Sequence, residues 1–405
     1  MVIFTLFNKN KILFFLEIIF WFLVGIIFYS YFGYAIIIWI LSLGSNKRIT
    51  QTTDEDLPEI TLFVAAYNER DYVRIKMENS LALDYPSDKV KHLWVTDGSN
   101  DGTPDLLKEY PQVKVLHEDE RNGKIAAMNR GMKYVKTPIV VFSDGNTKLG
   151  KNSLRKIAAL FADKKVGCVA GEKRIVNKDT DSAAGSGEGI YWKYESWLKR
   201  KEAHVYSVVG AAGELFAIRT DLFQEVEADT LLDDFIISLR VAMQGYEIQY
   251  DPEAYAIEVA SANVKEELKR KIRIAAGGMQ SMKRLAPLLN IFRYGMLSFQ
   301  YWSHKVLRWV AVPISLLLVF FVNMDLAAEF VLGGKGLLYF ITFVFQLLFY
   351  LMVLTGWMLE EKEVKFKIIF VPYYLFIMNL CMYLGFFRYI SGKQSVNWQR
   401  AQRGK

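Results

Sequence analysis

Residues 91–104 read KHLWVTDGSNDGTP, and this stretch decides the fold class. It begins with a short apolar run typical of a buried strand, and Asp, Gly, Ser and Asn follow directly. Thr103 and Pro104 then predict a helix start, with Thr103 as N-cap and proline at the first helical position. A strand, a polar turn and a helix in close succession are typical of one unit of an α/β protein.

The same order recurs along the middle of the chain. Strand-like runs at 60–66, 113–117, 138–143, 166–171 and 214–219 alternate with amphipathic stretches at 70–83, 103–110, 122–136 and 152–163. A further helix is expected to begin near Asp233 and to end at Gly245. The alternation predicts a Rossmann-like, mostly parallel sheet with helices on both faces.

Both ends of the chain are apolar. Residues 18–43 contain no charged residue and are long enough to cross roughly 30 Å of hydrocarbon as a helix, so they predict a retained membrane anchor. Further apolar runs lie at 309–324, 336–359 and 368–387. The first of these contains Pro313 and is bounded by Arg308 and Asp325, so a re-entrant or buried helix is the alternative for it.

The charge distribution supports this division. The formal net charge is +7, but residues 46–305 are close to neutral, which argues against a nucleic-acid partner. We therefore expect four parts: 1–45, an N-terminal transmembrane anchor; 46–264, a cytoplasmic α/β domain; 265–308, amphipathic helices at the membrane interface; and 309–405, a C-terminal transmembrane region with a basic tail. An ordinary amphipathic core helix is the alternative for 265–308.

The orientation in the membrane contains a conflict. Lys47 and Arg48 follow the first span, which favours a cytoplasmic middle domain. If all three late segments cross, the tail with Lys393 and Arg400 ends outside, against the positive-inside tendency. Either one late segment does not cross, or the tail is an exception.

Polar residues follow three of the expected strands at the point where each ends. These clusters are Tyr67, Asn68 and Glu69; Asp97 to Gly102; and Asp144, Gly145, Asn146 and Thr147. One such cluster usually caps a helix or makes a turn. Because the carboxyl ends of parallel strands meet at one edge of the sheet, three clusters together predict a ligand site there.

Motifs that are absent from the sequence exclude several classes of ligand site. No G-x-G-x-x-G follows the first strand, no G-x-x-x-x-G-K-[ST] is present, and the His and Cys residues have no zinc spacing. Oxygen ligands remain. Carboxylates and amides beside lysines suit Mg²⁺ or Mn²⁺ with a nucleotide diphosphate.

In this order and spacing, the motifs VAAYNER, VTDGSNDGT, NGKIAAMNRGM, VVFSDGNTKL, GAAGELFAIR and LLDDF resemble those of membrane-bound family 2 glycosyltransferases with a GT-A fold. The resemblance covers roughly 58–310. It implies inverting transfer of a hexose or N-acetylhexosamine from a UDP-sugar to a glycan or lipid-linked acceptor. It also implies a bacterial-type inner membrane, with membrane lipids and export or assembly proteins as partners.

The resemblance assigns the donor side of the site. Tyr67, Glu69 and Asp97 match positions that hold the uridine part, and Lys124 matches the basic residue beside the diphosphate. A solvated helix residue is the alternative for Lys124, but NGK before a helix favours a phosphate cradle.

The metal motif of the family is usually Asp-x-Asp, whereas this chain has Asp144-Gly145-Asn146. An amide can still bind a hard cation or a water on it, with one charge fewer. The resemblance therefore implies Asp144 as the main metal ligand and Asn146 as a weaker one.

The resemblance also assigns catalysis to Asp233 and Asp234, the second as general base on the acceptor hydroxyl. Both could instead complement a helix dipole, and Asp233 could have that role alone. Gly210, Gly213 and Glu214 match the segment under the acceptor, for which a plain glycine turn is the alternative.

Processive members carry Gln-x-x-Arg-Trp, where this chain has Arg270-Lys271-Ile272-Arg273-Ile274. Arg270 and Arg273 are the expected acceptor-side residues, but only Arg273 keeps the motif. A processive polysaccharide synthase, related to cellulose, hyaluronan and poly-N-acetylglucosamine synthases, is therefore the alternative to single transfer. A catalytically inactive membrane assembly partner is a third reading, against which the retained Asp97, Asp144 and Asp234 argue.

Overall fold

The computed structural model describes residues 2–44, 53–176, 183–259, 264–334, 336–359 and 370–392. The chain divides into two compact units. The helical unit comprises residues 1–39, 179–194 and 302–384, and the sheet unit comprises residues 40–178, 195–301 and 385–405. Lys47, Arg48 and the basic tail, on which the predicted orientation depends, lie outside the described residues.

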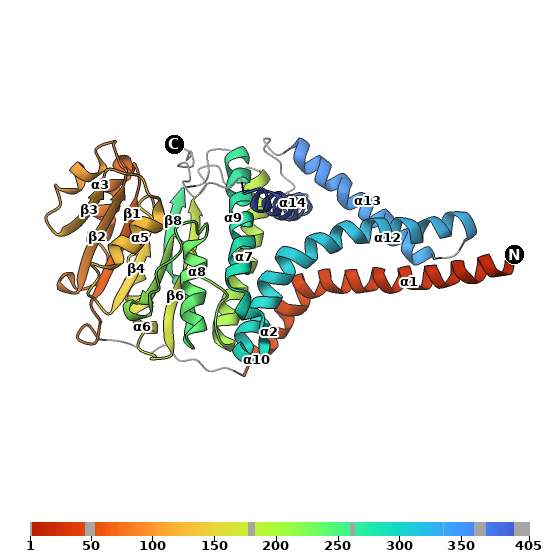
Figure 1. Ribbon diagram of the computed structural model, residues 1–405, viewed down its shortest axis with the longest axis horizontal. Coiled ribbons are helices and arrows are strands. Elements are labelled where there is room, and N and C mark those ends of the chain that lie inside the picture. Colours follow the sequence, from red (N-terminus) through yellow and green to blue (C-terminus); the bar gives the residue numbers. More distant parts are fainter. Residues whose placement is uncertain are drawn as a thin grey trace. The chain divides into compact units, whose positions relative to one another are not determined.

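The sheet unit is built on one eight-stranded sheet (Figure 1). Its strands are β1 Ile60–Ala66, β2 Val90–Asp97, β3 Val113–Glu118, β4 Ile139–Ser143, β5 Lys148–Leu149, β6 Val166–Val176, β7 Leu215–Arg219 and β8 Glu247–Val259. Their order is β3-β2-β1-β4-β7-β6-β8-β5, and β5 and β7 run antiparallel to their neighbours. The predicted mostly parallel sheet is confirmed.

The order of the first four strands creates a place for a ligand. From β1 the chain moves outward to β2 and β3, and it then returns to place β4 on the other side of β1. Connections that leave neighbouring strand ends in opposite directions open a crevice outside the sheet. The ends of β1 and β4 flank this crevice.

Helices cover both faces of the sheet, as predicted. The helices that lie wholly within the sheet unit are α3 Arg70–Leu81, α4 Thr103–Leu107, α5 Lys124–Met132, α6 Ser153–Leu160, α8 Asp233–Met243, α9 Val264–Arg284, α10 Ile291–Tyr294 and α11 Met296–Tyr301. On one face, Val64 and Trp94 pack with Val73 and Met77 of α3. On the other face, the rings of Phe63, Phe142 and Phe216 lie in a row.

Strand β8 was not expected from the sequence. It contains Pro252, which cannot donate a ladder hydrogen bond and is confined to edges and bulges. The β6–β8 pairing shifts register between Gly171 and Glu172, and the strand continues beyond the proline. The bulge at this register shift accommodates the proline within the strand.

One predicted cap is wrong, and one is confirmed. Helix α4 begins at Thr103, but the Thr103 hydroxyl donates to Asp101 and accepts from the Glu69 amide, so it does not cap the helix. The Asp101 carboxylate accepts from the Thr103 amide instead. Gly245 follows the end of α8 with φ +95°, a conformation that favours glycine.

The helical unit contains α1 Val2–Phe28, the start of α2 Tyr34–Ser42, α12 Val312–Gly333, α13 Leu337–Met358 and most of α14 Phe370–Ile390, and part of α7 Ala183–Val205. α1 and α12 lie side by side, where Phe20 and Leu23 pack with Val319 and Leu326 (Figure 1). Large side chains on the outside, such as Phe345 and Leu332, are exposed. This apolar exterior is typical of helices that face lipid.

Within the described ranges, four helices are long and apolar enough to cross a membrane: Lys9–Ser42, Met296–Gly333, Leu337–Met358 and Phe370–Ile390. The short run at 309–324 belongs to the second of these. Pro313 stands just after the π-helical stretch Trp302–Ala311, whose wider turns accommodate the missing backbone donor. The length of this segment therefore no longer favours a re-entrant helix.

Candidate active site

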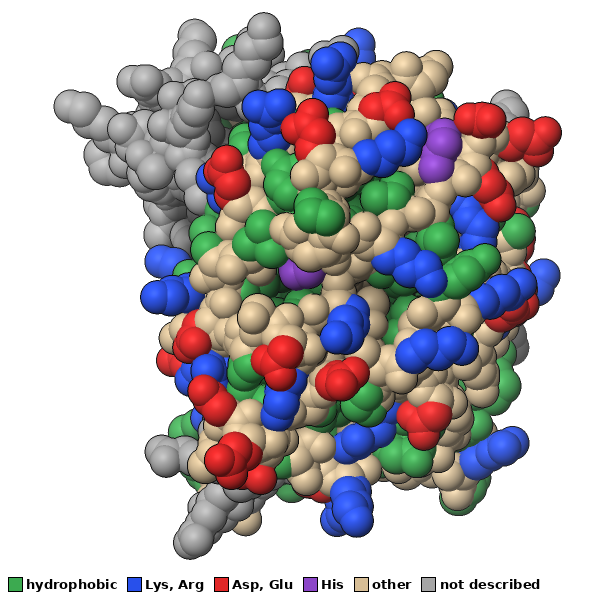
Figure 2. Space-filling model, turned by 90° about the vertical axis from the view of Figure 1, so that its left-hand side faces the viewer, with side chains coloured by type: hydrophobic (Ala, Val, Ile, Leu, Met, Phe, Trp, Pro, Cys, Tyr) green, Lys and Arg blue, Asp and Glu red, His purple; other side chains and the backbone are tan. Residues whose placement is uncertain are grey.

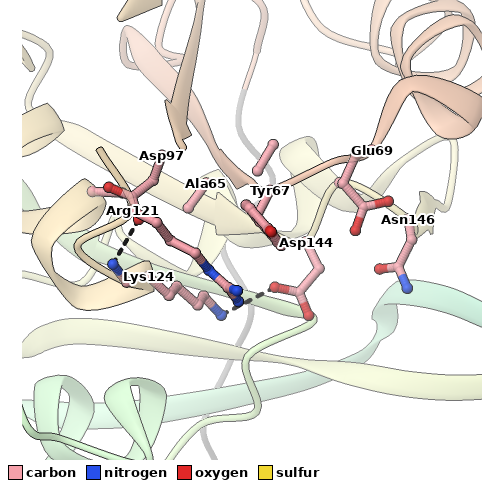
Figure 3. A pocket seen from close by; sticks show the side chains of 12 residues that line it. Ala65, Tyr67, Glu69, Asp97, Arg121, Lys124, Asp144 and Asn146 are labelled. Carbon is pink, nitrogen blue, oxygen red and sulfur yellow. Dashed lines mark hydrogen bonds and ion pairs between the residues drawn. The ribbon is translucent and has the colours of Figure 1, made fainter. Parts of the chain in front are cut away.

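A pocket opens at the carboxyl ends of β1, β2 and β4 (Figure 3). It is lined by Ala65, Ala66, Tyr67, Glu69, Asp97, Arg121, Gly123, Lys124, Ala127, Asp144, Gly145 and Asn146. Every residue predicted to bind the nucleotide sugar or the metal therefore lines one pocket.

Asp97 fixes one wall of this pocket. It ends β2 and is buried, and its Oδ2 accepts a 2.6 Å hydrogen bond from the Gly123 amide. Arg130 Nη1 lies 3.8 Å from its Oδ1. The carboxylate therefore holds the loop before α5 at the pocket.

Tyr67 carries a stacked arginine. The Arg121 guanidinium lies 3.7 Å from the centroid of the Tyr67 ring. A Cβ at Gly98, whose φ is +67°, would come within 2.6 Å of Arg121 Cβ, so glycine is needed there. Sequence reasoning missed Arg121, although a basic residue directly before NGK was a signal for it.

Lys124 connects the pocket to helix α8. Its Nζ lies 3.1 Å from Asp144 Oδ1 and 3.2 Å from Asp233 Oδ2. Burial alone would lower the pKa of Lys124, but Asp144, Asp233 and Asp234 together raise it above its usual value. The lysine is therefore a fixed positive charge between two parts of the site.

Asp234 stands beside this pair in the first turn of α8. Its Oδ1 accepts from the Phe235 amide at 2.8 Å. Burial, and next the negative charge of Asp233, raise the pKa of Asp234 to about 7. A Cβ at Gly213 would lie 3.3 Å from Asp234 Oδ2, so the glycine keeps space beside that oxygen.

A buried ion cluster lies on the other side, formed by Lys173 of β6, Glu214 before β7 and Glu258 of β8. Lys173 Nζ donates to Glu214 and lies 2.6 Å from Glu258 Oε2. Burial alone would raise the pKa of Glu214, but Lys173 and Arg270 lower it to about 2. The predicted acceptor residue Glu214 is therefore ionised and held within the protein. Lys173 and Glu258 were not predicted.

Helix α9 contributes the remaining predicted residues. Arg270 forms a two-point contact with Glu267, at 2.7 and 2.9 Å. Burial lowers the pKa of Arg273, and the charges of Asp233, Asp234 and Asp144 oppose this shift. Arg273 is thus the α9 residue that lies in the field of the paired aspartates.

The same helix holds the loop that leads into α8. Gln280 accepts from the Leu231 amide at 2.9 Å and donates to the Asp229 carbonyl at 2.7 Å. A Cβ at Gly277 would come within 2.6 Å of Leu232. Because these residues directly precede Asp233, α9 fixes where the paired aspartates begin.

The residues at the pocket suit a metal ion that is also bound by the substrate. In the part of the chain that the structure describes, no group of three or more His, Cys, Asp or Glu could hold a metal ion. Asp144 and Asn146 offer one carboxylate and one amide oxygen at the pocket. Mg²⁺ is often bound by one or two carboxylates together with substrate phosphates. The pair therefore suits a metal shared with a diphosphate.

Comparison with known proteins agrees with this geometry. Residues 58–277 match the family described as "Glycosyltransferase like family 2". The chain is 28% identical over 247 residues to the poly-beta-1,6-N-acetyl-D-glucosamine synthase of Staphylococcus aureus (strain MSSA476), which covers 59% of each chain. It is 24% identical over 244 residues to the synthase of the same name from Staphylococcus epidermidis. The chain thus matches less than two thirds of the length of these relatives.

A solved structure shares the fold. The mannosyltransferase PcManGT from Pyrobaculum calidifontis, in complex with GDP-Man and Mn²⁺, superposes with a TM-score of 0.67 at 21% identity, covering 94% of this chain and 100% of that chain. Since the family match spans more than half of the residues, it shows the family directly. The chain belongs to the family 2 glycosyltransferases, and its sheet unit has the GT-A fold.

Proposed function

We propose that the protein transfers a hexose or N-acetylhexosamine, with inversion, from a UDP-sugar to a glycan or lipid-linked acceptor at the cytoplasmic membrane face. The observation that carries this proposal is the position of Lys124. It joins Asp144, which lines the pocket at the strand ends, to Asp233, at the start of α8. A donor site and a candidate base thus lie next to each other.

The pocket has groups for each part of the donor. Asp97 and the stacked pair of Tyr67 and Arg121 offer a carboxylate and a flat surface to the uridine. Lys124 and Arg121 supply positive charge to the diphosphate. A Mg²⁺ or Mn²⁺ ion held by Asp144 and Asn146 would stabilise charge on the leaving diphosphate.

Asp234 is the proposed general base. It takes the proton of the acceptor hydroxyl while that oxygen bonds to the anomeric carbon and the bond to the diphosphate breaks. A pKa of about 7 suits this role, because base catalysis is most effective when the pKa is near the working pH. The space beside Gly213 admits the acceptor, and Asp233 holds Lys124 in place.

A processive polysaccharide synthase is the second candidate. It is favoured by the similarity to two synthases whose names describe a polymer of N-acetylglucosamine. Arg273 keeps the arginine of the processive motif near the paired aspartates. Single transfer is favoured by the missing Gln and Trp of that motif.

The test is to incubate the purified protein with a panel of labelled UDP- and GDP-sugars and to size the product. Transfer from a UDP-hexose or UDP-N-acetylhexosamine is expected. A long polymer would decide for the processive enzyme, and one added sugar for single transfer. Activity with GDP-mannose alone would contradict the proposed donor.

Placement is tested separately. A cytoplasm-active reporter fused near residue 180 should be bright, and a periplasm-active reporter there should be silent. The reverse pattern would contradict a cytoplasmic sheet unit. The same pair of reporters fused after Lys405 would show on which side the tail ends.

A further inference from the structure

A lysine is buried directly beneath the predicted metal motif. Lys76 lies on α3 and is only 1% exposed. Its Nζ donates to Ser143 Oγ at 2.6 Å, to the Thr147 carbonyl at 3.0 Å and to Thr147 Oγ1 at 3.2 Å. All three acceptors belong to the two residues that flank Asp144-Gly145-Asn146.

These flanking residues also close the loop on itself. Thr147 Oγ1 donates to the Asp144 carbonyl at 2.9 Å, and Ser143 Oγ contacts Thr147 Oγ1 at 3.1 Å. Ser143 Oγ further donates to the Glu214 carbonyl at 3.2 Å. The ammonium group therefore lies at the centre of the hydrogen bonds that shape the loop.

A second α3 residue holds the chain just beyond the loop. Asn79 Nδ2 donates to the Leu149 carbonyl at 2.9 Å, and its Oδ1 accepts from the Leu149 amide at 2.7 Å. Positions three apart lie on one face of a helix. Lys76 and Asn79 thus hold both ends of residues 143–149 from the same face of α3.

The chemistry of Lys76 argues for more than packing. A buried ammonium costs free energy that an apolar side chain of similar length would avoid. Its hydrogen-bond acceptors are neutral oxygens, and burial lowers the pKa of Lys76 to about 7 although the negative charge of Asp144 opposes this shift. Its amine group thus donates to three loop oxygens directly behind the main predicted metal ligand.

We propose that Lys76 is a positioning residue that, with Asn79, holds the Ser143–Thr147 loop so that Asp144 and Asn146 face the donor diphosphate and its metal. This inference rests on the proposed function. Helix α3 starts directly after the pocket residue Glu69. The inference gives this helix the role of fixing the pocket wall formed by residues 143–147, opposite the wall that Asp97 fixes.

The test compares Lys76→Met with Lys148→Met. Lys148 is exposed and directly follows Thr147, so the same substitution there is a matched control. Calorimetry measures UDP binding over a series of Mn²⁺ concentrations, and thermal melts check folding. Lys76→Met should weaken Mn²⁺-dependent UDP binding roughly ten- to hundredfold, the usual effect of losing a group that orients a metal ligand. Lys148→Met should bind as the wild type does.

Each outcome of this experiment either supports or overturns the positioning role of Lys76. Folded Lys76→Met protein with wild-type UDP affinity and an unchanged Mn²⁺ midpoint would show that the lysine only packs, and would overturn the inference. If Lys76→Met does not fold, Ser143→Ala is used, since it removes the 2.6 Å acceptor and keeps the lysine. A raised Mn²⁺ midpoint in that variant supports the inference, and an unchanged midpoint overturns it. Failure of the wild type to bind UDP at any Mn²⁺ concentration would instead overturn the proposed donor, and this inference with it.

Discussion

The donor half and the acceptor half of the proposed site are held in place in different ways. The donor half, Tyr67, Asp97 and Asp144, lies at the carboxyl ends of three neighbouring strands. One of its supports is the hydrogen bond from the Gly123 amide to Asp97. The acceptor half depends on the buried cluster of Lys173, Glu214 and Glu258, from strands far apart in the sequence. Sheet topology places the first half, whereas charge balance holds the second.

This difference has an energetic consequence. A buried ion pair adds little net stability, yet removing one partner leaves an uncompensated charge and is strongly destabilising. The surface of the sheet unit contrasts with its interior, since Figure 2 shows Lys and Arg interspersed with Asp and Glu on one face. Exposed pairs of that kind contribute little. Substitutions in the donor half should therefore change binding, and those in the acceptor cluster should change stability.

The largest effect is expected at Asp234. Asn is nearly isosteric and keeps the contact with the Phe235 amide, but it cannot accept a proton at neutral pH. Asp234→Asn should lower the transfer rate by about 10² to 10⁴-fold, with donor affinity close to wild type. Initial rates at saturating donor measure this, and Asp233→Asn is the control. If Asp233→Asn were inactive and Asp234→Asn active, Asp233 would be the base. If both variants were active, the proposed mechanism would be contradicted.

The second-largest effect is a loss of stability on substitution in the acceptor half, which is not expected in the donor half. Lys173→Met leaves Glu214 and Glu258 buried without their lysine and should cost about 3–5 kcal/mol. At roughly 2–4 °C per kcal/mol for a domain of this size, the melting temperature should fall by at least about 6 °C. Lys165→Met, on an exposed lysine just before β6, should melt as the wild type does. Adding Glu214→Gln to Lys173→Met should recover part of the loss, and no recovery would contradict the charge explanation.

The donor half could be predicted because its signals are local. Strand β1 matches the predicted run residue for residue, since seven consecutive strand-like side chains end in a polar cluster. Asp97 is the last residue of β2, and Asp144 directly follows β4. Each cluster alone was ambiguous, and only the parallel arrangement of β2, β1 and β4 brings them to one pocket.

The acceptor cluster could not be predicted in this way. Lys173 and Glu258 are charged residues within strands, a pattern that is typical of solvent-facing positions. Only the pairing of β6 with β8, a strand that was not predicted, makes them neighbours. The buried position of Lys76 could not be predicted either, since a lysine in an amphipathic helix normally faces water.

A third prediction concerns the metal motif. Asp144→Ala should abolish the Mn²⁺-dependent part of UDP binding, because it deletes the only charged oxygen ligand of the motif. Asn146→Asp should preserve or tighten binding, since it adds a hard anionic ligand. Calorimetry with UDP and Mn²⁺ measures both. Equal binding by the wild type and Asp144→Ala would exclude the metal role of Asp144.

The smallest effect is a shift in the pH profile. Asp234 must be deprotonated to act as base, and its pKa is raised to about 7 by burial and then by Asp233. The rate should therefore rise with pH, and at pH 6 it should be about a tenth of its plateau. Asp233→Asn removes the neighbouring negative charge, so the rise should move to lower pH and the ratio of rates at pH 6 and pH 8 should increase. This ratio is independent of any uniform loss of activity. An unchanged ratio would mean that the charge of Asp233 does not raise the pKa of Asp234, and a decreased ratio would contradict the assignment of Asp234 as the base.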